Sequence, residues 1–370
     1  MKTICFITAA RSEYGLLKGL MQKVIMSPSF RFQLIVTGSH LLAEQGRTID
    51  LIVEDGMEIA EIVDCDLDTS SALNVATSMG RLSEKLADAF NRMRPDYLVV
   101  LGDRYELLAI CSTAFLMGIP IIHIGGGDKT EGAIDDNVRN AVTMLASYHF
   151  PGTESSKDNI IRMRGMDARI WNVGEPGLDA FREETLMNRE ELAQSLHIDT
   201  EKRWVLMTYH PETRESIAHN LRAAANCVEA LLSLGDFQVV ITCANADPGG
   251  NEINDLLQRI AEDHPERFSF FPSLGRNRYL SFMKQVAFVI GNSSSGIIEA
   301  PFLRVPVVNI GNRQKGRYQC QNVFQSDFRT EEIKSAITLA LETDRRWSDC
   351  DYWGDGYFAE KTIHILENNL

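Results

Sequence analysis

The sequence lacks paired cysteines and long apolar runs. Its seven cysteines are scattered over 370 residues without a CxxC pair, so it predicts neither a disulfide framework nor a zinc knuckle. The N-terminal stretch MKTICFITAA is too short to span a membrane and lacks the features of a signal peptide. We therefore expect a cytoplasmic protein that does not bind membranes.

Positive charge is also scarce. Lys and Arg number 37 against 51 Asp and Glu, which gives a formal net charge of -14. Such a balance argues against a general nucleic-acid or anionic membrane surface. Any bound anion must therefore be held by a local cluster of cations.

Several cofactor and metal signatures are absent as well. The chain has no GxGxxG, no GxxxxGK[ST] and no HExxH. These motifs carry dinucleotides, nucleotide phosphates or metal ions in many enzymes. We therefore expect neither a cofactor nor a metal.

Short β-branched runs alternate with amphipathic helical stretches twice along the chain. The first series is TICFIT, FQLIVTG, YLVVLGD, IPIIHIGGG and RIWNVG, and the second is WVLMTYH, FQVVITCA, FSFFPSL, FVIGNSS and VPVVNIG. This alternation predicts two α/β domains with doubly wound, Rossmann-like parallel sheets that face a cleft. We place them at residues 1–176 and 177–355, and the helical tail 356–370 is expected to join the first domain.

Polar clusters follow the predicted strands, where doubly wound sheets bind ligands. In the segment VIGNSSSGIIEAP, the serines Ser293 to Ser295 follow a strand and precede a helix, so backbone N–H groups and the helix dipole would face a phosphate. Gly296 allows close approach, and Glu299, one helical turn after Ser295, suits ribose hydroxyls. The alternative is that the serines only cap the helix and Glu299 is solvated.

Cations follow the next strand in GNRQKGR. The guanidinium groups of Arg313 and Arg317 suit phosphate oxygens, as does Arg11 in TAARSEYG after the first strand. For Lys315 and Arg317 a solvated basic turn is the alternative. A local anion site is predicted from these residues in an otherwise acidic chain.

Carboxylates crowd two further strand ends. Asp103 lies in GDRYE, and the turn GGGDKTEGAIDD contains Asp128, Glu131 and Asp135. Carboxylates close together raise one another's pKa, so that one can hold a proton while another accepts one. The alternative is that Asp135 caps a helix and Asp128 shapes a turn.

Four histidines lie at or beyond predicted strand ends. His40 and His210 are candidates for donating to a sugar hydroxyl or a phosphate. For His149 a structural role is favoured, and for His123 a structural role and a ligand-binding role are equally favoured.

Taken together, TAARSEYG, VTGSHL, GDRYE, GGGDKTEGAIDD, TYHPET, GNSSSGIIEAP and NIGNRQKGR resemble the hydrolysing UDP-N-acetylglucosamine 2-epimerases of sialic-acid synthesis. They are also similar to relatives that act on UDP-diacetamidobacillosamine for legionaminic acid. The resemblance implies a GT-B fold, with UDP bound mainly by the second domain and sugar chemistry on the first. It also implies a homodimer or homotetramer.

The resemblance implies roles for individual residues. Asp103 and Asp135 match acids implicated in catalysis, and Asp128 or Glu131 would compensate for Gly125, which stands where sialic-acid members have glutamate. Asn140 likewise replaces the histidine of their Arg-His pair. The substrate-binding set is Arg11, His40, Arg104, His210, Asn292, Ser293, Ser294, Ser295, Gly296, Glu299, Arg313 and Arg317.

The implied reaction releases UDP from C1 while a carboxylate removes the C2 proton, and the resulting glycal takes up water at C1 and a proton at C2. UDP-N-acetylglucosamine is the expected substrate and N-acetylmannosamine the product, with UDP-N,N'-diacetylbacillosamine as the alternative substrate. A GT-B glycosyltransferase and a non-catalytic UDP-sugar binder are the remaining alternatives, which fold alone does not separate.

Overall fold

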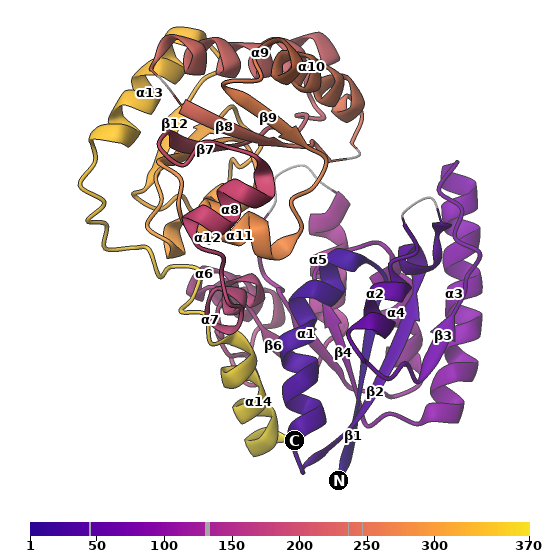
Figure 1. Cartoon of the computed structure of the whole chain (residues 1–370). Coiled ribbons are helices and arrows are strands. Elements are labelled where there is room, and N and C mark those ends of the chain that lie inside the picture. The colour runs from indigo at the N-terminus through magenta and orange to yellow at the C-terminus, as the bar shows by residue number, and fades with distance from the viewer. Residues whose placement is uncertain (44–45, 130–133, 236, 246) are drawn as a thin grey trace. The chain divides into compact units, whose positions relative to one another are not determined.

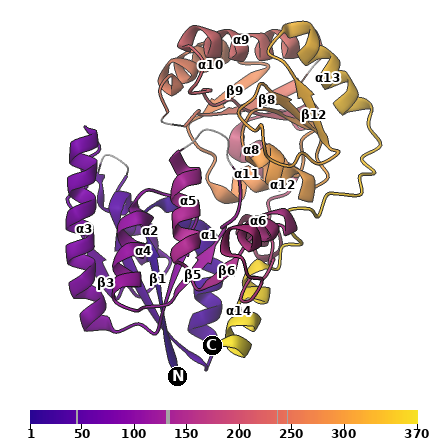
Figure 2. The same cartoon turned by 180° about the vertical axis from the view of Figure 1, so that it is seen from behind.

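The chain forms two compact units, Met1–Asp179 with Gly354–Leu370, and Ala180–Trp353. The structure is a computed structural model that describes residues 1–43, 46–129, 134–235, 237–245 and 247–370. Figures 1 and 2 show it from opposite sides. No helix in the described residues is long and apolar enough to cross a membrane.

The first unit is built on a six-stranded parallel sheet in the order β3-β2-β1-β4-β5-β6. Its strands are β1 (Lys2–Thr8), β2 (Phe30–Thr37), β3 (Glu61–Val63), β4 (Tyr97–Leu101), β5 (Ile121–Ile124) and β6 (Tyr148–Phe150). Its helices are α1 (Arg11–Met26), η1 (Gly38–Leu41), α2 (Ile49–Glu54), α3 (Ala72–Met93), α4 (Glu106–Leu116), α5 (Ile134–Leu145), α6 (Glu154–Arg164), η3 (Pro176–Asp179) and α14 (Phe358–Asn369).

Both faces of this sheet are covered because successive side chains of a buried strand point to opposite sides. Ile4 and Phe6 of β1 pack with α1 and α14 on one face, whereas Cys5 and Ile7 pack with α3, α4 and α5 on the other. The C-terminal helix α14, coloured yellow, lies against the indigo α1 in Figure 1. Asp179 fixes its start, because its carboxylate accepts hydrogen bonds from the first two amides of α14.

The second unit repeats the arrangement in the order β12-β11-β10-β7-β8-β9. Its strands are β7 (Arg203–Thr208), β8 (Phe237–Thr242), β9 (Phe268–Phe271), β10 (Phe288–Gly291), β11 (Val307–Ile310) and β12 (Val323–Ser326). Its helices are α7 (Ala180–Glu183), α8 (Arg189–Leu196), α9 (Ile217–Ser233), α10 (Gly250–Asp263), α11 (Arg276–Met283), α12 (Ser295–Phe302) and α13 (Thr330–Glu342). One face is covered by α9, α10 and α13, and the other by α8, α11 and α12.

The predicted α/β class with two doubly wound sheets is confirmed. The prediction of a strand over RIWNVG is wrong: within it, only Ile170 forms an isolated bridge, to His149 of β6. Arg169 has a positive φ of 63°, which interrupts the extended backbone immediately before Ile170.

In each sheet the strand order reverses at one point, between β1 and β4 in the first unit and between β7 and β10 in the second. Chains leaving two such neighbouring strands turn to opposite faces and leave a crevice at the carboxyl ends, where α/β proteins bind ligands. The two crevices define where functional side chains should be sought.

Candidate active site

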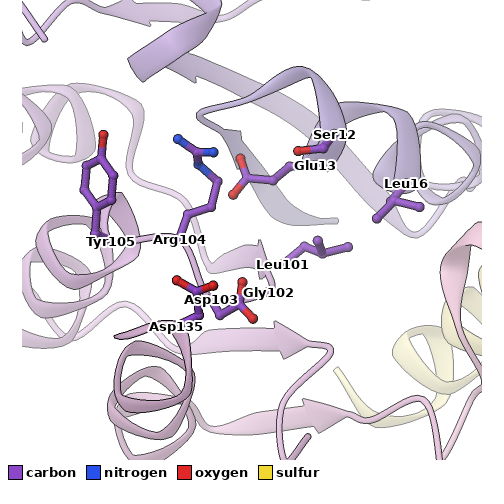
Figure 3. Close-up of a pocket in the computed structure, with 9 residues that line it drawn as sticks. All are labelled: Ser12, Glu13, Leu16, Leu101, Gly102, Asp103, Arg104, Tyr105 and Asp135. Carbon is purple, nitrogen blue, oxygen red and sulfur yellow. The ribbon is translucent and has the colours of Figure 1, made fainter. Parts of the chain in front are cut away.

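In the first unit, a pocket of about 450 Å³ lies at the reversal point. The first turn of α1 contributes Ser12 and Glu13, and the segment after β4 contributes Gly102 to Tyr105; Leu16, Leu101 and Asp135 complete the lining. Figure 3 shows Arg104 and Glu13 pointing toward one another, with Asp103 below them. Three predicted residues, Asp103, Arg104 and Asp135, are thus brought together in one pocket.

Asp103 is held by a buried cation. Arg139 of α5, which is 4 % exposed, forms an ion pair with the Asp103 carboxylate and a second one, at 3.3 Å, with Asp136. Arg139 also donates a hydrogen bond of 2.9 Å to the backbone carbonyl of Asp128. One arginine therefore ties Asp103 at the end of β4 to the turn after β5.

Asp128 has protein partners of its own. Its carboxylate accepts a hydrogen bond from Ser156 of α6, and its backbone carbonyl accepts the one from Arg139. It is absent from the described residues that line the pocket of Asp103 and Asp135. Glu131 lies outside the described residues.

Gly125 lies beside the same pocket. It has a φ of +75°, and a Cβ added to it would have Gly102 N as its nearest neighbour, at 3.9 Å. The position where related sequences carry glutamate is therefore open toward a residue that lines the pocket, although its backbone conformation favours glycine.

Glu13 is a residue that the motifs did not single out. Its Oε2 accepts hydrogen bonds from the amides of Ala9 and Ala10, at 2.7 and 3.0 Å, whereas Oε1 is buried without a hydrogen-bond partner in the described part of the chain. Burial raises the pKa of Glu13 to about 7, with Arg104 opposing and Glu106 adding to the shift. It is thus a carboxyl group that can exchange a proton near neutral pH.

A second pocket of the first unit contains two predicted cations. Arg11, which is exposed at the first turn of α1, and Arg104 line it together with Ala10, Ser12, Ser39 and Thr48. Arg104 forms an ion pair of 2.7 Å with the buried Glu106. Two guanidinium groups at a helix N-terminus suit an anion.

His40 lies behind this pocket and has partners for both ring nitrogens. Nε2 is 3.0 Å from Thr8 Oγ1, and Nδ1 is 2.8 Å from Thr48 Oγ1. The side chain is fully buried, and burial lowers its pKa to about 4, so the ring is neutral. Because both ring nitrogens have partners inside the protein, His40 links Thr8 to Thr48 behind the pocket.

In the second unit, the ends of β7 and β10 are joined by the fully buried Asn292. Its Oδ1 accepts from the His210 amide at 2.7 Å, its Nδ2 donates to the His210 carbonyl at 2.8 Å, and its own carbonyl accepts from Arg313 at 3.2 Å. Gly291 has a φ of +130°, and a Cβ there would lie 2.0 Å from Thr208 O. Because Gly291 has no side chain, the turn that carries the serines can lie close to β7.

The protonation state of His210 follows from one hydrogen bond. Its Nδ1 accepts from the Asn245 amide at 3.0 Å, so the neutral ring carries its hydrogen on Nε2. Burial lowers the pKa of His210 to about 4, and nearby Arg313 adds to the shift. His210 is therefore a neutral donor at physiological pH.

The serine turn lies where the sequence predicted it. Ser294 is the N-cap of α12, Ser295 and Gly296 begin the helix, and Ser293 is half-buried beside them. Glu299 lies one turn further along, and its buried Oε2 has no hydrogen-bond partner in the described residues. Burial raises the pKa of Glu299, whereas Arg317 and Arg276 lower it.

The loop that carries Arg313 and Arg317 is fixed from the side of β7. Glu212 of TYHPET accepts a hydrogen bond of 2.8 Å from the Asn312 amide, and Gln314 donates one of 2.8 Å to the Asn292 carbonyl. Within the described residues, no cluster of three or more His, Cys, Asp or Glu side chains could hold a metal ion.

Comparisons with known proteins identify the family of the chain. The family model described as UDP-N-acetylglucosamine 2-epimerase matches residues 22–367. The chain therefore belongs to the UDP-N-acetylglucosamine 2-epimerase family, and it is an enzyme of the UDP-sugar 2-epimerase class.

Two relatives illustrate the similarity. The chain is 34 % identical to the GDP/UDP-N,N'-diacetylbacillosamine 2-epimerase (hydrolyzing) of Campylobacter jejuni, with 88 % of this chain and 84 % of that protein covered. It is 31 % identical to the UDP-N,N'-diacetylbacillosamine 2-epimerase (hydrolyzing) of Legionella pneumophila, with 99 % and 96 % covered. The crystal structure of a Neisseria meningitidis UDP-GlcNAc 2-epimerase bound to UDP-GlcNAc shares the fold, with a TM-score of 0.79, 17 % identity and full coverage of both chains.

Proposed function

We propose that this chain is a hydrolysing 2-epimerase, which converts a UDP-linked 2-acetamido sugar to UDP and the free sugar with inverted configuration at C2. Two observations carry the proposal. The first unit has a pocket lined by carboxyl groups, and the second has a serine turn and arginines. The first set suits proton transfer, and the second suits a nucleoside diphosphate.

The second unit would hold UDP. Its diphosphate would accept hydrogen bonds from Ser293, Ser294 and Ser295 at the start of α12. Gly296 is buried and lets this turn pack against β11, because a Cβ there would lie 3.0 Å from Val307 Cγ1. Arg313 and Arg317 of the same unit would balance the charge of the diphosphate. Glu299, which has an unpartnered carboxylate oxygen, would bind the ribose hydroxyls, and His210 would donate from Nε2 to the nucleotide.

The first unit would handle protons. As the C1–O bond to UDP breaks, positive charge develops on the ring and acidifies the C2–H bond, so a carboxylate can remove that proton. The product of this step is a glycal. Water then adds at C1, and a proton is returned to the opposite face of C2. Asp103 and Asp135 are the proposed proton carriers, with Asp128 and Glu131 as the remaining acids of the turn.

Two substrates are proposed for a direct comparison. UDP-N-acetylglucosamine, which would give N-acetylmannosamine, is expected from the sequence motifs, and UDP-N,N'-diacetylbacillosamine is favoured by the names of the two relatives. An NMR time course with each substrate in deuterated water tests the proposal. The expected product is a free sugar with deuterium at C2 and inverted configuration, together with UDP. A released sugar that keeps its C2 proton and configuration would contradict epimerisation and indicate plain hydrolysis.

The same assay includes exhaustive chelation. Turnover is expected to survive EDTA, because arginines and a helix N-terminus supply the positive charge for the leaving diphosphate. Loss of turnover that magnesium restores would contradict this part of the proposal. Incubation without an acceptor also separates this reaction from glycosyl transfer, which requires one.

A further inference from the structure

A row of three hydroxyl groups links α11 to the serine turn. The phenol of Tyr279, from α11, is 2.6 Å from Ser295 Oγ, and Ser295 Oγ is 3.0 Å from Ser293 Oγ. Ser295, in the middle, is 8 % exposed, whereas Tyr279 and Ser293 at the two ends are half-buried. The row therefore runs from α11 through a buried hydroxyl to the turn before α12.

Each hydroxyl carries one hydrogen, so the row has two possible directions. If Tyr279 donates to Ser295, then Ser295 donates to Ser293, and the hydrogen of Ser293 is free to point away from the row. In the reverse direction, Ser293 donates inward and offers only lone pairs. An anion at the turn is stabilised by the first direction and repelled by the second.

The chemistry of the phenol favours the first direction. A phenol, with a reference pKa of about 10, is more acidic than an alkyl hydroxyl and is the stronger donor. Burial raises the pKa of Tyr279 to about 12, against the effect of its hydrogen bonds with Ser295, Thr208 and Ser293, so the phenol keeps its proton throughout the neutral range. Nearby Glu299 acts in the same sense and disfavours a phenolate.

We propose that Tyr279 is a positioning residue, which acts through Ser295 to order Ser293 as a hydrogen-bond donor toward the diphosphate of the nucleotide. This inference rests on the proposed function, because it needs a diphosphate at the start of α12. Tyr279 acts through the serines and does not itself contact the ligand. Its effect is therefore confined to ligands that carry phosphate.

The test compares UDP with uridine by calorimetry in the full chain. Tyr279→Phe removes the phenol oxygen and keeps the ring. We expect about five- to tenfold weaker binding of UDP, the usual effect of one hydrogen bond, and unchanged binding of uridine. Tyr318→Phe is the matched control, because it removes the hydroxyl of an exposed tyrosine in the same unit, which donates to Asp349 at 3.1 Å. The control should bind both ligands as the wild type does.

A double-mutant cycle with Ser293→Ala distinguishes ordering from general support of the fold. If Tyr279 acts through Ser293, the double variant should bind UDP about as weakly as Ser293→Ala alone, whereas independent effects would multiply. Equal losses for UDP and uridine, or multiplying effects, would overturn the inference. Should Tyr279→Phe fail to fold, Ser295→Ala interrupts the same row of hydroxyls, and its double variant with Ser293→Ala should then bind UDP about as weakly as Ser293→Ala alone.

The two proposals fail in different ways. If the wild-type protein binds neither UDP nor uridine, the proposed nucleotide site is wrong. If the wild type binds UDP and Tyr279→Phe behaves like Tyr318→Phe, only the role of Tyr279 is wrong.

Discussion

Arg139 forms an ion pair with Asp103 and is itself almost fully buried. The ion pair fixes the Asp103 carboxylate at the edge of the pocket, where the proposed general base has to be held in position. Asp135 lines the same pocket from the start of α5.

Replacing Asp103 should affect turnover and not nucleotide binding. We expect Asp103→Asn to lower kcat by about 10²- to 10⁴-fold, the usual contribution of a general base, with UDP affinity unchanged. Steady-state kinetics and calorimetry on the same preparation measure the two quantities. Asp88→Asn, at an exposed position of α3 in the same unit, is the control. Near-normal kcat in Asp103→Asn would remove Asp103 from the proton-transfer step.

His210 allows its two ring nitrogens to be tested separately. In His210→Asn, the amide oxygen can replace Nδ1 and accept the hydrogen bond from the Asn245 amide. In His210→Gln, the longer side chain places its NH₂ group near the position of Nε2. If Nε2 donates to the nucleotide, His210→Gln should bind UDP more tightly than His210→Asn, by about fivefold. Because His210, with its pKa of about 4, is neutral in the wild type, the affinity of the wild type relative to His210→Gln should not change between pH 6 and 8. Equal affinities would mean that Nε2 makes no contact with UDP.

The sequence predicted most of the fold because the central strands are continuous apolar runs, such as TICFIT and FVIGNSS. The strands it missed are β3, β6 and β12, of three or four residues each at or beside the sheet edges. A run this short shows no periodicity, and its pairing depends on the neighbouring strand. RIWNVG was mistaken for a strand because its apolar residues do not reveal the left-handed backbone of Arg169.

The candidate residues were chosen from the ends of the predicted strands, but the sequence did not reveal which residues would form hydrogen bonds with them. Tyr279 lies 16 residues before Ser295, and Asn245 lies 35 residues after His210, so only folding brings each pair together. Asn292 and His40 have partners inside the protein that the motifs do not specify. Glu13 was also not readable from the sequence, because a glutamate signals a helix N-terminus when Ser, Thr, Asp or Asn lies three residues before it, and that position is Ala10.

Glu13 should make stability depend on pH in an unusual sense. Its pKa is raised from 4.5 to about 7 in the folded chain, so the folded state binds more protons than the unfolded state between these values. The resulting contribution to the free energy of unfolding is about 3 kcal/mol. It is fully present below pH 4.5 and is lost as the pH rises through 7. Glu13→Gln stays neutral, so its free energy of unfolding relative to wild type should increase from pH 5 to pH 8.

Urea unfolding at several pH values measures this effect. Glu54→Gln, at an exposed position of α2, is the control and should show a constant difference from wild type. A Glu13→Gln difference that is also constant from pH 5 to 8 would mean that Glu13 is ionised throughout.

His149 gives the opposite dependence. In the described part of the chain neither of its ring nitrogens has a hydrogen-bond partner, and the residue is 2 % exposed. Burial lowers its pKa to about 3, with His123 and Arg164 adding to the shift. Below about pH 6.5 the unfolded chain therefore takes up a proton that the folded chain does not, and stability falls as the pH decreases.

Replacing this ring by an apolar side chain of similar size should remove the penalty. We expect His149→Leu to be close to wild type in stability at pH 7.5, because a buried polar group without a partner contributes little there. At pH 5 the variant should be more stable than wild type by about 2 kcal/mol, because its unfolded state has lost the titrating group. Urea unfolding at the two pH values measures both differences. His364→Leu, at an exposed position of α14 in the same unit, is the control. If His149→Leu shows the same small difference at both pH values, His149 must be protonated within the fold, and a partner for its ring must exist.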